Sequence, residues 1–477
     1  MSRVRAVLKN TLYQGITRML GVTTGIIAFA LLTRYLGPAG FGDYSIALTY
    51  VGAVAAIADL GLPVLFLRTI SLHRPSNKTT IANLNTLRLL ATAIVFTCGI
   101  TIALFLPYGA NVTLGIAITS IGFIGVNFTQ YLGSIFQERL KTHESGIADS
   151  LGRFVILVLS FWGIYHEASL SWFFWSFVIG CAISFLLTYL LSLRHMPSSL
   201  AFHPQAWRPL LHQAVPLMLV SLFSLVYFKV DTLFLSLMDS SYVVGVYSAA
   251  YKYIDVFVTV PAIFGALALP FFTRSSAYRD ERRFSLQLER SLRLILIAGG
   301  LLAGITLVEA DRFILLFSGQ AYQESIPILR ILSFSILPLF LGSLCTTALI
   351  ARNRSTVVAR LFGITAFVSL ILYVVTIREF SLYGAALSTV LIELSIAIAT
   401  LFAISRDATL RVRWHIVPGY LASLAGFVVC LFAAHTLPLV FTLLIGVAVY
   451  ALLLVLLRVV YVEEISHVLI GTRLPER

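Results

Sequence analysis

The stretch GDYSIALTYV, from Gly42 to Val51, recurs 203 residues later as GVYSAAYKYI, from Gly245 to Ile254. Both copies have a glycine, two tyrosines, a serine and an alanine at the same places. The same offset places the first predicted membrane span over the seventh and the second over the eighth. We therefore predict two copies of one structural unit. Chance recurrence of aromatic and small residues near a membrane surface is the alternative.

Both copies lie in a strongly apolar chain. Of the 477 residues, 59% are hydrophobic and 12% are charged, and the mean hydropathy is +0.94. Soluble domains carry about 25% charged residues, so this composition excludes an ordinary soluble protein. The apolar residues come in blocks of about 20, the length that crosses a bilayer as a helix. The sequence predicts an all-α integral membrane protein with about 14 transmembrane helices.

The distribution of positive charge predicts the orientation of these helices. Of the 34 lysine and arginine residues, 27 fall on the side of the N-terminus and four on the opposite side. Positively charged connections stay in the cytoplasm, so we expect both termini there. The net charge of +13 thus reflects membrane topology, and we expect no nucleic-acid partner. The predicted spans are residues 10–33, 43–67, 83–106, 112–136, 147–165, 169–192, 211–237, 243–272, 292–308, 326–350, 357–376, 382–404, 415–434 and 438–460.

The repeat and the spans together predict four parts of the chain. Because six is an even number, both copies enter the membrane from the same side, which makes the repeats parallel. The parts are an N-lobe of helices 1–6 at residues 1–193, a hinge-like cytoplasmic linker at 194–210, a C-lobe of helices 7–12 at 211–405, and helices 13–14 with a cytoplasmic tail at 406–477.

Three cations lie inside predicted spans and away from the span ends, at Arg18, Lys229 and Lys252. An ionisable group at the bilayer centre costs about 2.5–3.5 kcal/mol, so such groups usually face the interior of a helix bundle. Interhelical ion pairs that fix packing and a cationic patch for an anionic substrate are the two interpretations. Lys252 and Asp255 share a helix face and can pair, whereas Lys229 and Asp231 are two residues apart and cannot.

Acidic residues also lie inside the spans. Asp59 falls in the cytoplasmic half of the first lobe with Arg18 and, nearer the surface, Arg88. Because Gly61 and Pro63 follow it, a capped or kinked helix end is favoured over a site in a cavity. The other acids fit either an ion-pair partner or a proton or sodium site that couples transport to an ion gradient. They are Asp231, Asp255 and Glu393.

Catalytic chemistry finds no support in the sequence. There is no glycine-rich phosphate loop, no G-x-S-x-G motif and no metal-ligand spacing among the nine histidines. The four cysteines lie in apolar blocks and suggest no disulfide framework. We expect neither an enzyme nor a metal or cofactor. Three tyrosines can stack on sugar rings or anchor helices at the membrane surface, namely Tyr227, Tyr247 and Tyr251.

Five stretches in order along the chain carry a family likeness. They are LTRYLGPAGFGDYSIALTYV (Leu31–Val51), IADLGLP (Ile57–Pro63), YFKVDTLFLS (Tyr227–Ser236), GVYSAAYKYID (Gly245–Asp255) and LYGAALSTVLIE (Leu382–Glu393). Together they resemble polysaccharide-biosynthesis flippases of the multidrug/oligosaccharidyl-lipid/polysaccharide (MOP) exporter superfamily. The likeness covers nearly the whole chain, although each pattern alone is degenerate.

The resemblance implies two six-helix lobes in a V shape around a cation-rich cavity, which Arg18, Lys229 and Lys252 would supply. It implies alternating-access transport of an undecaprenyl-diphosphate-linked oligosaccharide to the outer leaflet of a bacterial cytoplasmic membrane. In fourteen-helix relatives that flip peptidoglycan precursor, the last two helices help form a groove for the lipid tail. Helices 13–14 either do the same in this chain or pack on the second lobe.

Two other functions stay open from the sequence. A cation-coupled multidrug exporter of the same superfamily would prefer an acidic cavity, and the central parts of the spans hold three basic and four acidic residues. A glycan polymerase or ligase would carry a large outer loop, and the longest outer connection covers only residues 309–325. The expected partners are a polyprenyl-diphosphate-linked glycan, membrane lipids and the polysaccharide polymerase machinery. We expect a monomer, with coupling to H+ or Na+ left open.

Overall fold

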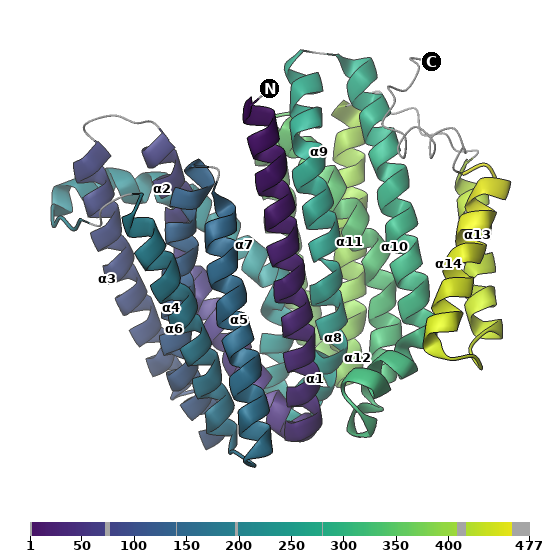
Figure 1. The fold of residues 1–477 in the computed structure, drawn as a ribbon, viewed down its shortest axis with the longest axis horizontal. Coiled ribbons are helices and arrows are strands. Elements are labelled where there is room, and N and C mark those ends of the chain that lie inside the picture. Colours follow the sequence, from purple (N-terminus) through teal and green to yellow (C-terminus); the bar gives the residue numbers. More distant parts are fainter. Residues whose placement is uncertain are drawn as a thin grey trace. The chain divides into compact units, whose positions relative to one another are not determined.

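The computed structural model describes residues 2–71, 77–139, 141–195, 199–278, 280–407 and 416–459, and all regular elements within them are helical (Figure 1). Ten of the described helical segments are long and apolar enough to cross a membrane. The prediction of an all-helical membrane protein is confirmed. The helices are α1 (Ser2–Asp59), α2 (Leu62–Ser71), α3 (Asn77–Ala103), α4 (Ala110–Glu138), α5 (Thr142–Tyr165), α6 (Leu170–Leu193), α7 (Pro204–Met238), α8 (Ser241–Phe257), α9 (Thr259–Ala277), α10 (Glu281–Phe317), η1 (Gln320–Tyr322), α11 (Ser325–Ala351), α12 (Ser355–Asp407), α13 (Ile416–Ala433) and α14 (Leu439–Leu456).

The predicted spans fall on these helices, but spans and helices do not correspond one to one. α1 contains the first span and most of the second, joined at Gly37, whose φ of 65° suits glycine. α12 contains the eleventh and twelfth spans, joined at Ser381 with φ 50° and ψ −128°. The sequence predicted connections of several residues at both places. The structure instead interrupts each helix at a single residue.

α10 begins before its apolar block and is interrupted where that block ends. The hydrophobic stretch covers residues 292–308, whereas α10 begins at Glu281, leaves the helical conformation at Glu309 (φ −95°, ψ 17°) and continues to Phe317. The outer connection predicted at 309–325 therefore begins at this interruption and contains a short helical stretch and η1. Hydropathy marks only the apolar centre of a membrane helix, so polar turns at its ends escape a hydropathy search.

By packing, the chain divides into two compact units. Unit 1 contains Met1–Ala249, Phe317–Tyr322 and Phe362–Ala385, and unit 2 contains Ala250–Leu316, Gln323–Leu361 and Ala386–Arg477. The units follow from packing, whereas the predicted lobes follow from the repeat. The lobe boundaries accordingly stay a prediction.

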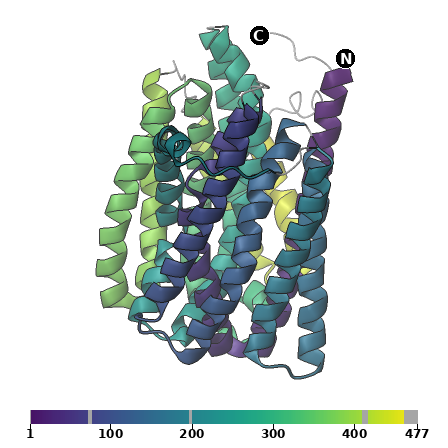
Figure 2. The ribbon, with the colours of Figure 1, turned by 90° about the vertical axis from the view of Figure 1, so that its left-hand side faces the viewer.

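In unit 1, α4 packs against α1 and α6, and α5 packs against the same two helices. Figure 2 shows α3 to α6 running alongside one another. A buried apolar cluster joins α2, α3 and α4 to the start of α7, and Phe66 stacks on Tyr131 within it at a centroid distance of 4.3 Å. This cluster attaches the first helix of the second repeat copy to the first copy.

The described part of the predicted linker is bound to α3. The side-chain oxygen of Asn83 accepts hydrogen bonds from the backbone N–H of His203 at 3.0 Å and from the indole N–H of Trp207 at 3.1 Å. The Asn85 amide donates to the carbonyl oxygen of Ser199 at 2.9 Å. The segment predicted as a hinge-like connection is thus held along its described length by α3.

The two repeat copies cross each other in unit 1 at their shared glycine. A Cβ atom on Gly42 would clash with the carbonyl oxygen of Ser241, and one on Gly245 would clash with the carbonyl oxygen of Pro38. Pro38 and Ser241 are separated by the same 203 residues as the two glycines. Each glycine thus meets the residue equivalent to the one that the other glycine meets. Such a reciprocal contact is typical of a two-fold axis between two copies. The crossing supports the predicted repeat independently of sequence identity.

In unit 2, the last two helices pack against α10 (Figure 1). A Cβ on Gly300 or Gly304 of α10 would meet Tyr420 or Phe427 of α13, so these two helices approach closely. The Tyr420 hydroxyl also donates to the carbonyl oxygen of Leu296 at 2.8 Å. These contacts support packing as the role of helices 13–14, and a lipid groove beside them stays a prediction.

We expect Gly42→Ala and Gly245→Ala each to lower the thermal stability of the protein. The added methyl group would meet a backbone carbonyl that no side-chain rotation can clear, and overpacking of this kind costs about 1–3 kcal/mol. Gly25→Ala is the matched control, because a Cβ on Gly25 in α1 has nothing within 4 Å. Thermal unfolding of purified protein in detergent measures the difference. An unchanged melting temperature in both crossing variants would contradict this account.

Candidate functional site

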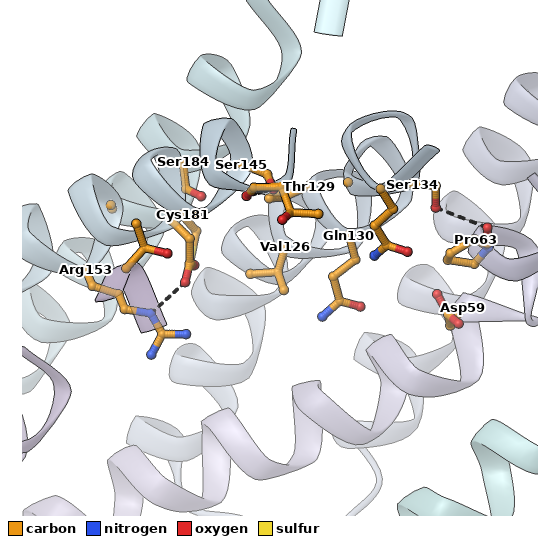
Figure 3. Close-up of a pocket in the computed structure, with 18 of the residues that line it drawn as sticks. Asp59, Pro63, Val126, Thr129, Gln130, Ser134, Ser145, Arg153, Cys181 and Ser184 are labelled. Atoms are coloured by element: carbon orange, nitrogen blue, oxygen red, sulfur yellow. Dashed lines mark hydrogen bonds and ion pairs between the residues drawn. The ribbon is translucent and has the colours of Figure 1, made fainter. Parts of the chain in front are cut away.

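A polar pocket lies within unit 1 between α1, α2, α4, α5 and α6 (Figure 3). Its volume is about 840 Å³, which is in the range of ligand-binding cavities. Much of the lining comes from the end of α4 and the start of α5, next to a connection predicted to be cytoplasmic. The pocket therefore lies towards the predicted cytoplasmic side of unit 1.

The polar lining arises from one face of α4 and one face of α5. The spacing of three and four residues keeps each set on one side of its helix. Opposite faces of α5 present exposed apolar residues such as Phe154 and Phe161, as expected towards lipid. The lining residues of α4 are Val126, Thr129, Gln130, Gly133, Ser134 and Gln137. Those of α5 include Thr142, Ser145, Asp149, Gly152 and Arg153.

Asp59 lies at one end of the pocket and is paired with a buried arginine. Arg88 of α3 is 0% exposed, and its Nη2 lies 3.2 Å from the Oδ1 of Asp59. The same nitrogen donates to the side-chain oxygen of Asn127 at 3.0 Å. The negative charge of Asp59, which lines the pocket, is therefore compensated by Arg88, which lies outside the lining.

Arg88 also completes the end of α1. Its Nη1 donates to the carbonyl oxygens of Ala58 at 3.2 Å and of Asp59 at 2.9 Å. These carbonyls lack helical partners because the chain leaves the α conformation at Leu60 and Gly61, whose φ values are 49° and 67°. The structure places Asp59 at a helix end that is both interrupted and capped, and it buries Arg88 completely beside that end.

Asp149 and Arg153 form the second charged pair of the pocket. Arg153 Nε lies 2.9 Å from Asp149 Oδ2, one helical turn away on α5, and both side chains are about half exposed. Figure 3 shows Arg153 at one end of the lining and Asp59 at the other, with Thr129 and Gln130 between them. The described lining thus carries two carboxylates, each with its own guanidinium.

The predicted cationic residues of the first and seventh spans fall outside the described side chains. This applies to Arg18 and Lys229, and also to Tyr227. Arg18 directly follows Thr17 in α1, and Thr17 lines the pocket. The backbone thus brings Arg18 to the same turn of α1 as a lining residue, and its role stays a prediction.

The predicted residues of the second repeat copy are mostly buried. Asp231 is 2% exposed and accepts a hydrogen bond of 2.6 Å from the hydroxyl of Tyr247, which is itself 0% exposed. Tyr251 is also buried, and so is Glu393. The structure therefore joins Asp231 to Tyr247 rather than leaving either side chain open in this conformation. Lys252 and Asp255 are partly exposed in unit 2.

Sequence reasoning missed most of this lining. It counted Arg153 only among the cations on the side of the N-terminus, whereas the structure places it three turns into α5, beside Asp149 in the lining. It also passed over Gln130 and Gln137, because a search for charges does not detect uncharged polar groups. The signal was available as polar residues spaced three and four apart within an otherwise apolar span.

Among the described residues, no group of His, Cys, Asp and Glu is arranged to hold a metal ion. The pocket is instead a polar, charge-balanced cavity among membrane helices, and such cavities mark transport pathways. Fold and site together define a multi-pass membrane transporter.

Comparison with known proteins gives the family. Residues 7–276, more than half of the chain, match the polysaccharide biosynthesis protein family, and the chain belongs to it. A Shigella flexneri protein named as a candidate O-antigen transporter is 23% identical over 404 residues, which is 80% of this chain and 94% of that protein.

Solved structures share the fold. A structure of the lipid II flippase MurJ in an inward closed conformation aligns with 97% of this chain and 100% of its own, with a TM-score of 0.76 and 15% identity. An inward-facing multidrug resistance transporter of the MATE family, in the MOP superfamily, aligns with 84% of this chain and 99% of its own. Its TM-score is 0.66 and its identity 14%. The MOP fold expected from the sequence is confirmed.

We expect Arg88→Met to destabilise the protein strongly. Removing one partner of a buried ion pair costs about 3–5 kcal/mol, and this change also leaves the carbonyls at the end of α1 without a donor. Arg153→Gln is the control, because its pair with Asp149 is exposed and such pairs contribute about 1 kcal/mol or less. Thermal unfolding in detergent compares the two. Equal melting temperatures for both variants would be incompatible with a structural role of Arg88.

Proposed function

We propose that the protein is a flippase that moves a polyprenyl-diphosphate-linked oligosaccharide, with undecaprenol as the lipid, from the cytoplasmic to the outer leaflet of a bacterial cytoplasmic membrane. The family, the candidate O-antigen transporter from Shigella flexneri and the MurJ fold support it. In this proposal both termini are cytoplasmic, as the distribution of positive charge predicts, and the protein works as a monomer.

The observation that carries the proposal is the contrast between the two ends of unit 1. The polar pocket lies at the predicted cytoplasmic end, whereas the repeat copies cross at the predicted outer end through Gly42 and Gly245. Tyr108, in a predicted outer connection, and Ser236, at the outer end of the predicted seventh span, share a hydrogen bond of 2.9 Å. Burial raises the pKa of Tyr108, so its hydroxyl stays neutral in this bond. Such an arrangement fits the inward state of alternating access.

The ionisable residues of the spans then have distinct roles in the proposal. Arg18, Lys229 and Lys252 bind the diphosphate, because cations inside a membrane protein attract anionic substrate groups. The polyprenyl tail stays in lipid. Asp231, Asp255 and Glu393 are the candidates for coupling to protons or sodium.

A multidrug exporter is the second candidate, since MATE transporters share the fold. An exporter of lipophilic cations would offer the ligand a carboxylate without a counter-ion. In the described lining, Asp59 is paired with Arg88 and Asp149 with Arg153. This pairing favours the flippase over the exporter.

Transport of a fluorescent undecaprenyl-diphosphate oligosaccharide in proteoliposomes tests the proposal. Movement is scored by accessibility of the glycan to an external glycosidase. We expect wild-type protein to move the lipid, and Arg18→Ala, Lys229→Ala and Lys252→Ala each to slow it at least about tenfold through loss of a charge-assisted contact. Full activity in all three variants would remove the cationic site. Transport of a cationic dye under an ion gradient, with no lipid movement, would favour the exporter.

The outer contact offers a test of alternating access. In a cysteine-free background, we expect Tyr108→Cys with Ser236→Cys, joined by a short reducible bis-thiol reagent, to lose transport and to regain it on reduction. The reagent would hold the connection that contains Tyr108 against the outer end of α7 and prevent outward opening. The single Tyr108→Cys variant, treated alike, controls for modification alone. Unchanged transport by the cross-linked protein would contradict outward opening at this contact.

A further inference from the structure

We infer that the pocket of unit 1 is a glycan subsite, which binds the uncharged sugars of the substrate directly and takes no part in binding the diphosphate. The inference rests on the proposed function and deepens it by assigning this pocket one chemical part of the substrate. Gln130 and Gln137 of α4 are its specificity-determining residues.

The charge balance of the lining excludes the other parts of a lipid-linked glycan. Its two carboxylates are matched by guanidinium groups at 3.2 Å for Asp59 and 2.9 Å for Asp149. A diphosphate would need an excess of positive charge, which the described part of this lining does not have. A polyprenyl chain would leave the polar groups without water or partners, at a cost for each buried group. A neutral ligand rich in hydroxyl groups meets neither obstacle.

The hydrogen-bonding groups of α4 suit sugar hydroxyls. Gln130 and Gln137 have exposed side chains and make no hydrogen bond to other residues that the structure describes. Each amide offers donors and an acceptor, and a sugar hydroxyl both donates and accepts. Thr129 and Ser134 donate to the backbone oxygens of Gly125 and Pro63, so their hydroxyl oxygens remain as acceptors.

The extent of the lining fits a chain of sugars rather than one ring. The lining face of α4 runs from Val126 to Gln137, which covers about 17 Å of helix at 1.5 Å per residue. Phe177 of α6 also lines the pocket and is partly exposed, with its ring held by Phe123 at a centroid distance of 5.2 Å. A fixed aromatic ring beside amide groups provides both a stacking face and hydrogen-bond partners for a sugar.

Two substrates with the same carrier and different glycans test this inference. One is the lipid-linked oligosaccharide extracted from the source cells, and the other is undecaprenyl diphosphate carrying a single N-acetylglucosamine. We expect Gln130→Ala with Gln137→Ala to slow transport of the oligosaccharide about tenfold and that of the single sugar less than about twofold, because only the longer glycan reaches both amides. Gln205→Ala, an exposed glutamine in the first turn of α7 outside the lining, should change neither rate.

Equal slowing of both substrates, or no slowing of either, would overturn the glycan subsite while leaving the flippase intact. If wild-type protein moves neither substrate, the proposed function fails. Binding of the free oligosaccharide, released from its lipid and followed by saturation-transfer NMR, then decides the subsite by itself. Binding that the double variant loses supports it, and equal binding by both proteins, or none to either, overturns it. Matching melting temperatures for the variant and the wild type exclude misfolding.

Discussion

Backbone contact between the two repeat copies at Gly42 and Gly245 is the constraint on which unit 1 depends. Lipid competes for apolar side chains, so close approach of backbones over small residues must supply much of the attraction between membrane helices. Near this contact, the tyrosines at equivalent positions of the two copies make different contacts. Tyr44 stacks on Phe174 at a centroid distance of 5.6 Å, whereas the hydroxyl of Tyr247 donates a hydrogen bond to Asp231. The copies share the crossing and differ in what surrounds it, which leaves the second copy with a buried acid that the first lacks.

The sequence was sufficient for the all-helical membrane class and the MOP fold, because the length and apolar character of the helices can be read without knowing how they pack. The crossing at Gly42 and Gly245 supports the predicted repeat. The prediction of the connections failed at Gly37 and Ser381. Hydropathy predicts a loop of several residues at each place, whereas a single residue interrupts the helix in the structure. The sequence did not reveal the partners of Arg88 and Arg153, since depth along a span does not tell which helix lies beside a side chain. The polar face of α4 escaped because glutamine and threonine do not stand out when only charges are counted.

The charges of the first copy illustrate how a membrane protein uses an arginine without offering it to a ligand. Arg88 satisfies a carboxylate, an amide and the last carbonyls of α1 at once. A charge inside a bilayer is tolerated when it is paired with an opposite charge and hydrogen-bonded within the protein, as both terminal nitrogens of Arg88 are. The same arrangement leaves the neighbouring pocket polar but electrically balanced. A structural ion pair thereby determines what kind of ligand the cavity can accept.

The attachment of residues 199–207 to α3 has a consequence for biogenesis. Asn83 is synthesised 120 residues before His203, so its side chain already lies in a completed part of the chain when the linker leaves the ribosome. Domains generally fold from the N-terminus as they are made. The first copy thus provides a folded binding site for the segment just before α7 and for its first turn. The position of α7 is therefore fixed before the rest of the second copy inserts into the membrane.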